Sequence, residues 1–365
     1  MKKSWTRWIP AVIVPAIVVA GAIIIPSAAD ASPRLPEKSA QQLLEFIAAS
    51  TATEYSGTIE QSSNLGLPQL PSIGGSSSAG RSTTATALDL LTASHTARVF
   101  VGSDHRARVQ VLDQLAERDI VVNGAEVWTW DSKANTATHV TLAADSPAKT
   151  ATAPPTSELA KTPAELATQL LTSLDPSTVV TVSDTARVAG RPVYQLVLTP
   201  RSGTTLVGSV VLAVDSETGM PLGVTISAVG QSEPAFSVQF SSIDFSAPDS
   251  SVFAFTAPVG AKVAEKSLSA SDAPEGSATR AEGTPQPTIT GSGWSSIVAL
   301  PAGTMPVGAA GAPGDSSSKL LDQLLTPVAG GKVLQTSLVS VFLAADGRVF
   351  IGAVSADQLQ AAAGQ

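Results

Sequence analysis

Hydrophobic and polar residues alternate with a period of two along most of the chain, which predicts a mainly β protein. Few helical segments separate these stretches, so consecutive strands are expected to pair antiparallel rather than form a parallel α/β sheet. The expected strands span residues 55–61, 97–101, 106–111, 118–122, 126–130, 138–142, 178–189, 192–199, 206–215, 221–229 and 235–245. The pattern therefore predicts one long antiparallel meander.

Two turn signals support this interpretation. Residues 102–105 read Gly-Ser-Asp-His, which suits the turn of a hairpin between the strands at 97–101 and 106–111. Asn123-Gly124 is a strong hairpin signal, because both residues tolerate the left-handed backbone that a tight turn requires. These turns set which neighbouring strands should pair.

Helical periodicity occurs in a few shorter stretches. Residues 39–50 place Leu43 and Ile47 on one face, and residues 162–174 begin with Pro163 at a position suited to the first turn of a helix. Both segments are expected to be helices.

The N-terminus has the features of an export signal. Basic residues precede an uncharged apolar run at residues 9–25, and Ala29-Asp30-Ala31 follows it as a pattern suited to signal peptidase. Residues 1–31 are therefore either a cleaved signal peptide or an N-terminal membrane anchor with the same orientation. Both alternatives predict an extracytoplasmic protein, secreted or tethered to the outer face of the plasma membrane by residues 9–25.

The C-terminal third divides into two further regions. Residues 261–292 are rich in Ser, Pro, Ala, Glu and Thr and are expected to form a flexible linker. Residues 293–365 are expected to form a small α+β unit, with strands at 333–343 and 348–354 and a final helix at 356–363.

Composition narrows the function. The chain has 22 Lys and Arg against 30 Asp and Glu, a net charge of −8, which argues against a nucleic-acid partner. It has no cysteine, which excludes disulfides, cysteine-ligated metals, thiol catalysis and lipid attachment at cysteine. Ser316-Ser-Ser-Lys319 matches one motif of serine acyl-enzymes, but the partner motifs are missing. We therefore expect no catalytic residue, no metal site, no cofactor and no enzymatic activity.

Several motifs in order carry a resemblance. They are Glu126-Val-Trp-Thr-Trp-Asp131, Gly190-Arg-Pro-Val-Tyr-Gln-Leu-Val-Leu-Thr-Pro200 and Val211-Leu-Ala-Val-Asp-Ser-Glu-Thr-Gly-Met-Pro221. Across residues 38–260 their order and spacing resemble LolA-like periplasmic carriers. The closest likeness is to actinobacterial LolA-like proteins, kin to the N-terminal domain of RseB-type sigma-factor regulators.

The resemblance implies a fold and a function. The fold is a large curved antiparallel sheet, an unclosed barrel with helices over its open face and an apolar cavity between them. The function is that of an exported, non-enzymatic binder or carrier of lipid or lipoprotein acyl chains. The alternative is an RseB-like envelope-stress regulatory module that binds a membrane protein partner. Unlike the lipid-anchored relatives, this chain has no lipobox cysteine.

The resemblance also implies which residues line the cavity. Apolar residues at alternate positions of the expected strands would face it, although the same residues also fit an ordinary packed core. The candidates are Val99, Val101, Val109, Val111, Trp128, Trp130, Leu196, Leu198, Val224, Ile226, Phe236, Val238 and Phe240.

Overall fold

The computed structural model describes residues 35–67, 94–113, 116–142, 177–268, 286–303 and 324–364. The expected signal peptide or anchor at residues 1–31 and the expected helix at 162–174 lie outside these residues. Within the part of the chain that the structure describes, no helix has the length and apolar character needed to span a membrane.

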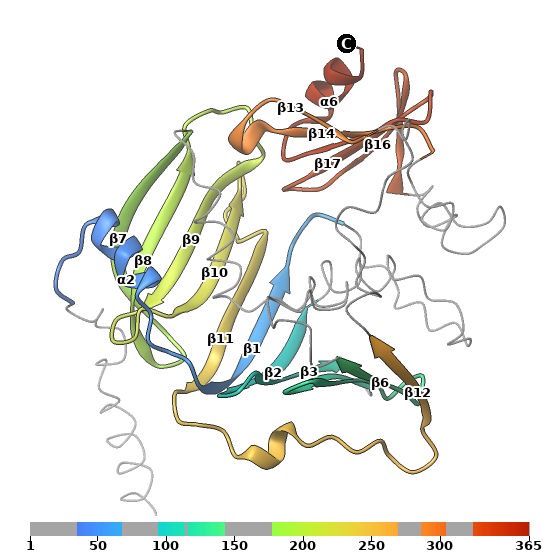
Figure 1. Cartoon of the computed structure of the whole chain (residues 1–365). Coiled ribbons are helices and arrows are strands. Elements are labelled where there is room, and N and C mark those ends of the chain that lie inside the picture. Colours follow the sequence, from blue (N-terminus) through green and yellow to red (C-terminus); the bar gives the residue numbers. More distant parts are fainter. Residues whose placement is uncertain are drawn as a thin grey trace, which may run out of the picture. The chain divides into compact units, whose positions relative to one another are not determined.

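One curved sheet of twelve strands dominates the fold (Figure 1). Its order is β12-β6-β5-β4-β3-β2-β1-β11-β10-β9-β8-β7, so the meander is interrupted where β1 pairs with β11 and where β6 pairs with β12. The strands are β1 (Tyr55–Ser63), β2 (His95–Gly102), β3 (Arg106–Asp113), β4 (Ala116–Asn123), β5 (Glu126–Asp131), β6 (Thr136–Leu142), β7 (Thr178–Val188), β8 (Arg191–Pro200), β9 (Val207–Asp215), β10 (Pro221–Ala228), β11 (Phe236–Asp244) and β12 (Lys262–Leu268). β7 and β12 are its two edges, so the sheet is not closed into a barrel. Each strand expected between residues 55 and 245 is present.

The predicted hairpin turns are confirmed. Gly124 has a φ of 62°, in the left-handed region, and connects β4 to β5. In the turn between β2 and β3, Asp104 and His105 each have a φ of 58°. Asp and His are among the residues most often found with this backbone conformation besides glycine, which explains why no glycine is needed at either position.

The helix expected at residues 39–50 is also confirmed. α2 (Ala40–Ala48) begins with a capping box, in which the Ser39 hydroxyl accepts a hydrogen bond from the Gln42 amide and the Gln42 side chain accepts one from the Ser39 amide. Leu43 and Ile47 are buried and pack in a core with Leu196 and other residues of β8–β10. The helix therefore covers one face of the sheet near β7 and β8.

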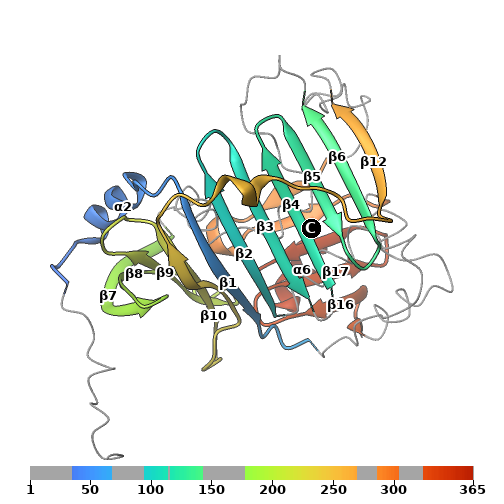
Figure 2. The same cartoon turned by 90° about the horizontal axis from the view of Figure 1, so that it is seen from below.

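Residues 245–261, which we call the strap, connect β11 to β12 across the opposite face of the sheet (Figure 2). The strap contains the short 3-10 helix η2 (Ser250–Phe253), which contacts β3 and β4. Phe253 is 2% exposed and lies against Gly102, with the Arg106 guanidinium 5.5 Å from the centre of its ring. Arg108 donates a hydrogen bond of 3.1 Å to the Val252 carbonyl.

The expectation of a flexible linker at residues 261–292 is wrong for two segments. Lys262–Leu268 form β12, which pairs in parallel with β6, and Thr288–Thr290 form β13. β12 is an edge strand that buries few side chains, so its apolar residues do not have to alternate with polar ones. Its three charged residues therefore give no period-two pattern from which a strand could be predicted.

The C-terminal unit contains a second sheet of six strands in the order β13-β14-β18-β17-β16-β15. Besides β13, its elements are β14 (Ile297–Leu300), β15 (Thr326–Val328), β16 (Gly331–Gln335), β17 (Ser340–Ala344), β18 (Val349–Gly352) and the expected final helix α6 (Ala356–Ala363). Phe342, Phe350 and Leu359 are buried in its core. The unit therefore has a hydrophobic core of its own.

The single strand expected at residues 333–343 is two strands, β16 and β17. Thr336 causes the break, because its hydroxyl accepts a hydrogen bond from the Val339 amide at 2.9 Å and donates one to the Val339 carbonyl at 2.8 Å. A threonine side chain bonded to its own turn competes with the strand ladder. The apolar run at this point is therefore folded back into a hairpin.

The burial of Phe253 predicts that the strap contributes to stability. Phe253→Ala should lower the free energy of unfolding by about 3–5 kcal/mol, because the substitution leaves a cavity against β2 and β3. Urea denaturation followed by circular dichroism measures this change. Val259→Ala, at a fully exposed position of the same strap, should change it by less than about 0.5 kcal/mol. Equal effects of the two substitutions would contradict a specific anchor at Phe253.

Candidate functional site

Strand register places the predicted apolar residues of β2 and β3 on one face of the sheet. Antiparallel partners that lie opposite each other point to the same side. The partners form two rows across β2–β5, Val99–Val109–Ile120–Thr129 and Val101–Ala107–Val122–Val127. Val111 lies on this face as well, opposite Ala97.

The same face continues across the other half of the sheet. There the rows are Leu196–Leu212–Val224–Val238 and Leu198–Val210–Ile226–Phe236. The two halves join where Ile59 pairs with both Phe240 and Ala97. We call this the inner face, and the face that carries the strap the outer face. Eleven of the thirteen candidates, all but the two tryptophans, therefore share the inner face.

Burial differs between the two halves of the inner face. Leu196, Leu198 and Val224 are buried in the core beneath α2, while Val238 and Phe240 are buried in a second cluster. Ile226 and Phe236 are half-buried beside these clusters, and Val99 and Val111 are buried on the other half. The β8–β11 half therefore consists largely of ordinary packed core.

A half-buried apolar surface extends over β2–β6. Its residues, which we call the inner apolar surface, are Val101, Ala107, Val109, Ile120, Val122, Val127 and Val140. The candidates from the sequence did not include Ala107, Ile120, Val122, Val127 or Val140. Carrying the alternation of Val109 from β3 to its antiparallel neighbour β4 would have found Ile120 and Val122.

Trp128 and Trp130 do not belong to the inner face. Trp128 lies opposite Val121, which lies opposite Arg108, so both tryptophans are on the outer face. The Trp128 ring stacks on His139 at 4.1 Å and also contacts Phe255 of the strap at 5.3 Å. Alternation predicted that the two tryptophans share a side, but it could not show which side.

A polar cluster borders the inner apolar surface. Arg118 and Asp131 are cross-strand partners on the inner face, next to Val111. Asp113 receives a hydrogen bond of 3.0 Å from Arg118 Nε and lies 3.2 Å from His95 Nδ1. Burial alone would raise the pKa of Asp113, but its bonds to His95 and Arg118 outweigh burial and lower it. The inner face thus combines an aliphatic surface with an ionised border.

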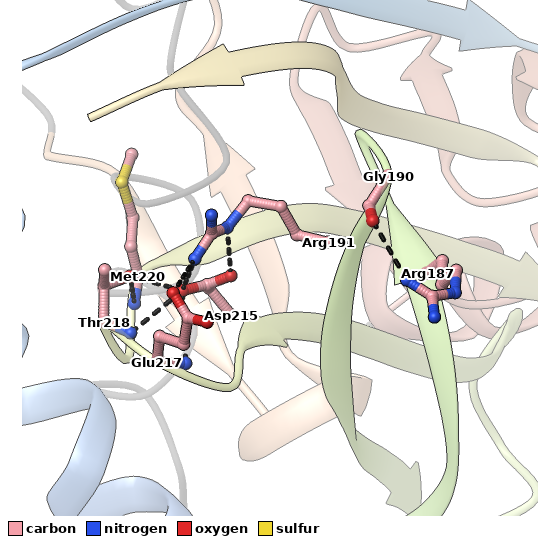
Figure 3. A network of polar contacts seen from close by, with 7 residues as sticks. All are labelled: Arg187, Gly190, Arg191, Asp215, Glu217, Thr218 and Met220. Carbon is pink, nitrogen blue, oxygen red and sulfur yellow. Dashed lines mark hydrogen bonds and ion pairs between the residues drawn. The ribbon is translucent and has the colours of Figure 1, made fainter. Parts of the chain in front are cut away.

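A buried ion pair fixes the turn between β9 and β10 (Figure 3). Asp215 is 0% exposed, and Arg191 donates to both of its oxygens, at 2.6 Å from Nε and 3.1 Å from Nη2. The Thr218 amide and hydroxyl donate to Asp215 at 2.9 and 2.8 Å. Burial would raise the pKa of Asp215, but these hydrogen bonds outweigh it and hold the pKa below its usual range. The sequence predicts this turn but gives no sign of the ion pair.

No group of three or more His, Asp or Glu side chains that could hold a metal ion occurs among the described residues. The absence of a catalytic residue and of a cofactor stays a prediction.

Comparisons with known proteins give matches among solved structures alone. No family model and no curated protein matches the chain. A MucA/MucB complex from Pseudomonas aeruginosa is 17% identical, with a TM-score of 0.42 over 88% of this chain and 96% of that chain. An uncharacterized conserved protein from Thermus thermophilus is 13% identical, with a TM-score of 0.33 over 62% of this chain and 99% of that one.

A LolA superfamily protein from Nitrosomonas europaea is also similar, at 11% identity and a TM-score of 0.23 over 60% of this chain and 99% of that chain. Similarity at this level of identity says nothing about a ligand or a partner of this chain.

The Asp215–Arg191 pair yields a prediction about stability. Asp215→Asn should lower the free energy of unfolding at pH 7 by about 3 kcal/mol, because it leaves the Arg191 charge without its buried partner. Urea titrations at several pH values measure the effect. The pKa of Asp215 is lower in the folded than in the unfolded chain. Ionised Asp215 therefore contributes fully to the free energy of unfolding above the unfolded carboxyl pKa of about 3.9, and this contribution is lost as pH falls through the pKa of the folded state.

The difference between the natural chain and the variant should therefore shrink below about pH 4. Glu217→Gln is the control, because Glu217 also pairs with Arg191 but its side chain is 74% exposed. It should cost less than about 1 kcal/mol. A difference for Asp215→Asn that does not change with pH would contradict the assigned role.

Proposed function

We propose that the chain is an exported, non-enzymatic binder that receives the acyl chain of a lipid or lipoprotein on its inner apolar surface. The observation that carries the proposal is the run of half-buried aliphatic residues that share one face across β2–β6. These residues lie on the concave side of a sheet whose strap covers the other side. The resemblance of residues 38–260 to LolA-like carriers supports the same function.

The chemistry of this surface suits an alkyl chain. Its residues are aliphatic, so they offer van der Waals contact without a hydrogen-bonding requirement that an acyl chain could not meet. Each methylene that leaves water contributes about 0.8 kcal/mol, so roughly ten methylenes contribute about 8 kcal/mol before the cost of immobilising the ligand. Binding of this kind needs no catalytic group.

The border of the surface suits a polar headgroup. Arg118, Asp113 and Asp131 lie at one end of the strand rows, while Val101, Val122 and Val127 lie toward the other. An amphiphile can therefore place its chain over the valines and keep its polar end near the ionised cluster. Residues 1–31 would deliver such a protein across the plasma membrane.

A second candidate function is an RseB-like regulatory module that binds a membrane protein. The observation that favours it is that the C-terminal unit bonds to the large sheet. Trp294 Nε1 donates to the Thr178 hydroxyl at 2.9 Å, and the Ala353 carbonyl accepts from the Leu206 amide and the Thr205 hydroxyl, each at 2.8 Å. A unit held in this way could transmit the state of the inner face to a protein partner.

Native mass spectrometry of residues 32–365, produced with export, tests the acyl-binding proposal. We expect a bound mass that solvent extraction identifies as a lipid or an acylated peptide. Val109→Trp should reduce the occupied fraction at least about tenfold, because an indole on the half-buried inner surface fills space that the acyl chain would use. Leu196 is fully buried, so the same change there would test folding rather than binding.

Val229→Trp provides the matched control, because it makes the same change at a side chain that is 62% exposed. Its occupied fraction should equal that of the natural chain. A natural chain that carries no bound mass and takes up no added fatty acid would overturn the proposal. A Val109→Trp variant that keeps the occupied fraction of the natural chain would locate the ligand away from the inner face.

A further inference from the structure

The sheet edge at β6 is occupied by a segment of the chain's own sequence. All seven residues of β12 pair with β6 in unbroken register, from Lys262 opposite Thr136 to Leu268 opposite Leu142. Among the described residues this is the one parallel pair of the large sheet. Parallel pairing is slightly less stable per residue than antiparallel pairing. β12 is therefore a strand added to the edge of an otherwise antiparallel sheet.

β12 buries little of its side-chain surface. Lys262, Ala264 and Lys266 are exposed, Val263 is 46% exposed, and the Glu265 side chain is 68% exposed. Side chains on this strand thus contribute little hydrophobic stabilisation, and backbone hydrogen bonds to β6 supply most of what holds it. Segments with few buried apolar contacts are the first to open locally.

The edge beneath β12 has the composition of a strand that accepts a partner. β6 reads Thr-Ala-Thr-His-Val-Thr-Leu, which has no Lys, Arg, Asp or Glu and is rich in β-branched residues. An uncovered edge of this kind is a template for another strand, whereas natural edge strands carry charges that discourage pairing. β12 supplies such charges with two lysines and a glutamate, so it both fills and protects the edge.

One side-chain site gives the edge specificity. His139 of β6 lies opposite Glu265, with 2.7 Å between Nδ1 and the carboxylate, and the Glu126 carboxylate lies 3.5 Å from Nε2. The imidazole stacks on Trp128, which contacts Phe255. The ring is thus held in place from the sheet and the strap. A strand that pairs with β6 is recognised if it presents a carboxylate at this position.

The strap is anchored well before the residue at which β12 begins. Its anchor is Phe253, which is buried against β2 and β3. Beyond the anchor, Val259 is fully exposed and Gly260 has a φ of 86°, which marks a turn just before β12. Two hydrogen bonds with Asn135 close this turn. The Asn135 side-chain amide donates to the Gly260 carbonyl at 2.9 Å, and the Asn135 carbonyl accepts from the Lys262 amide at 3.0 Å. The exposed Val259 and the turn at Gly260 place the hinge about which β12 would detach at residues 259–261.

We propose that the β6 edge is a peptide-binding site that β12 occupies as a built-in competitor. The partner is an extended segment of another protein that pairs in parallel with β6 and presents a carboxylate to His139. It binds when β12 detaches at the hinge. This site is distinct from the inner apolar surface, because His139 faces the outer side of the sheet, and the proposal does not depend on acyl binding.

The test uses a fluorescent peptide with the sequence of residues 261–268 as the probe. Two variants set the state of the edge. Val263→Pro with Ala264→Pro removes backbone donors of β12 on both sides of the strand, so it should free the edge. Thr138→Cys with Ala264→Cys joins opposite positions of β6 and β12, in a chain with no other cysteine, and should close the edge when oxidised.

Fluorescence anisotropy should show at least about tenfold tighter peptide binding to the proline variant than to the natural chain, because the tethered competitor is removed. The oxidised cysteine variant should show no binding, and reduction should restore the weak binding of the natural chain. A peptide that carries Glu265→Gln should bind the proline variant about threefold to tenfold more weakly, because it loses the bond to His139.

Three results would overturn the proposal. One is a proline variant that keeps its far-ultraviolet circular dichroism and cooperative unfolding but binds the peptide no better than the natural chain. Another is equal peptide binding by the oxidised and reduced cysteine variants, which would place the peptide elsewhere. The third is a natural chain that dimerises with rising concentration while the oxidised cysteine variant stays monomeric. That result would make the β12 of a second copy the occupant of the edge.

Discussion

Covering both faces of one twelve-stranded sheet is the constraint on which the rest of this structure depends. Apolar side chains occur on both faces of the sheet, and other segments of the chain have to shield the side chains of each face from water. The strap covers the outer face of β2–β5, and α2 covers the inner face near β7 and β8. Between these covers, the inner apolar surface over β2–β6 is half-buried, and the fold itself thereby creates the candidate binding site.

Buried charges fix the parts that do the covering. Beneath the strap, Asp119 is nearly fully buried and accepts a hydrogen bond of 2.7 Å from Arg108, which also bonds the Val252 carbonyl. Burial raises the pKa of Asp119, although the bond from Arg108 opposes this rise. Such a pair is costly to desolvate but demands a defined geometry, so it holds the strap in one position on β3 and β4. The strap can then serve as a fixed arm from which β12 extends.

Much of the sheet was predictable because alternation and turn chemistry are local. Ala107 and Val109 alternate with Arg106 and Arg108, and Asn123-Gly124 can adopt the left-handed backbone, so strands and hairpins follow from short stretches of sequence. The parts that were missed depend on distant contacts. β12 is a strand because β6 lies beside it, and Thr336 breaks an apolar run through a bond to its own turn.

The candidate site was predicted in outline for the same reason. Alternation groups residues by side within a strand, but which side faces the strap depends on residues far along the chain. Trp128 and Trp130 were therefore grouped correctly with each other and wrongly with Val109. Likewise, the burial of Leu196 beneath α2 could not be read from β8, because it arises from a helix more than a hundred residues earlier.

The most direct test of acyl binding at the inner apolar surface is photolabelling with a fatty acid that carries a diazirine near the end of its chain. Labelled positions are mapped by mass spectrometry on residues 32–365. The account predicts labels on inner-face residues such as Val109, Ile120 and Val122, which excess unlabelled fatty acid removes. Labels confined to the outer face around Trp128 and Phe253, or labels that competition does not reduce, would contradict it.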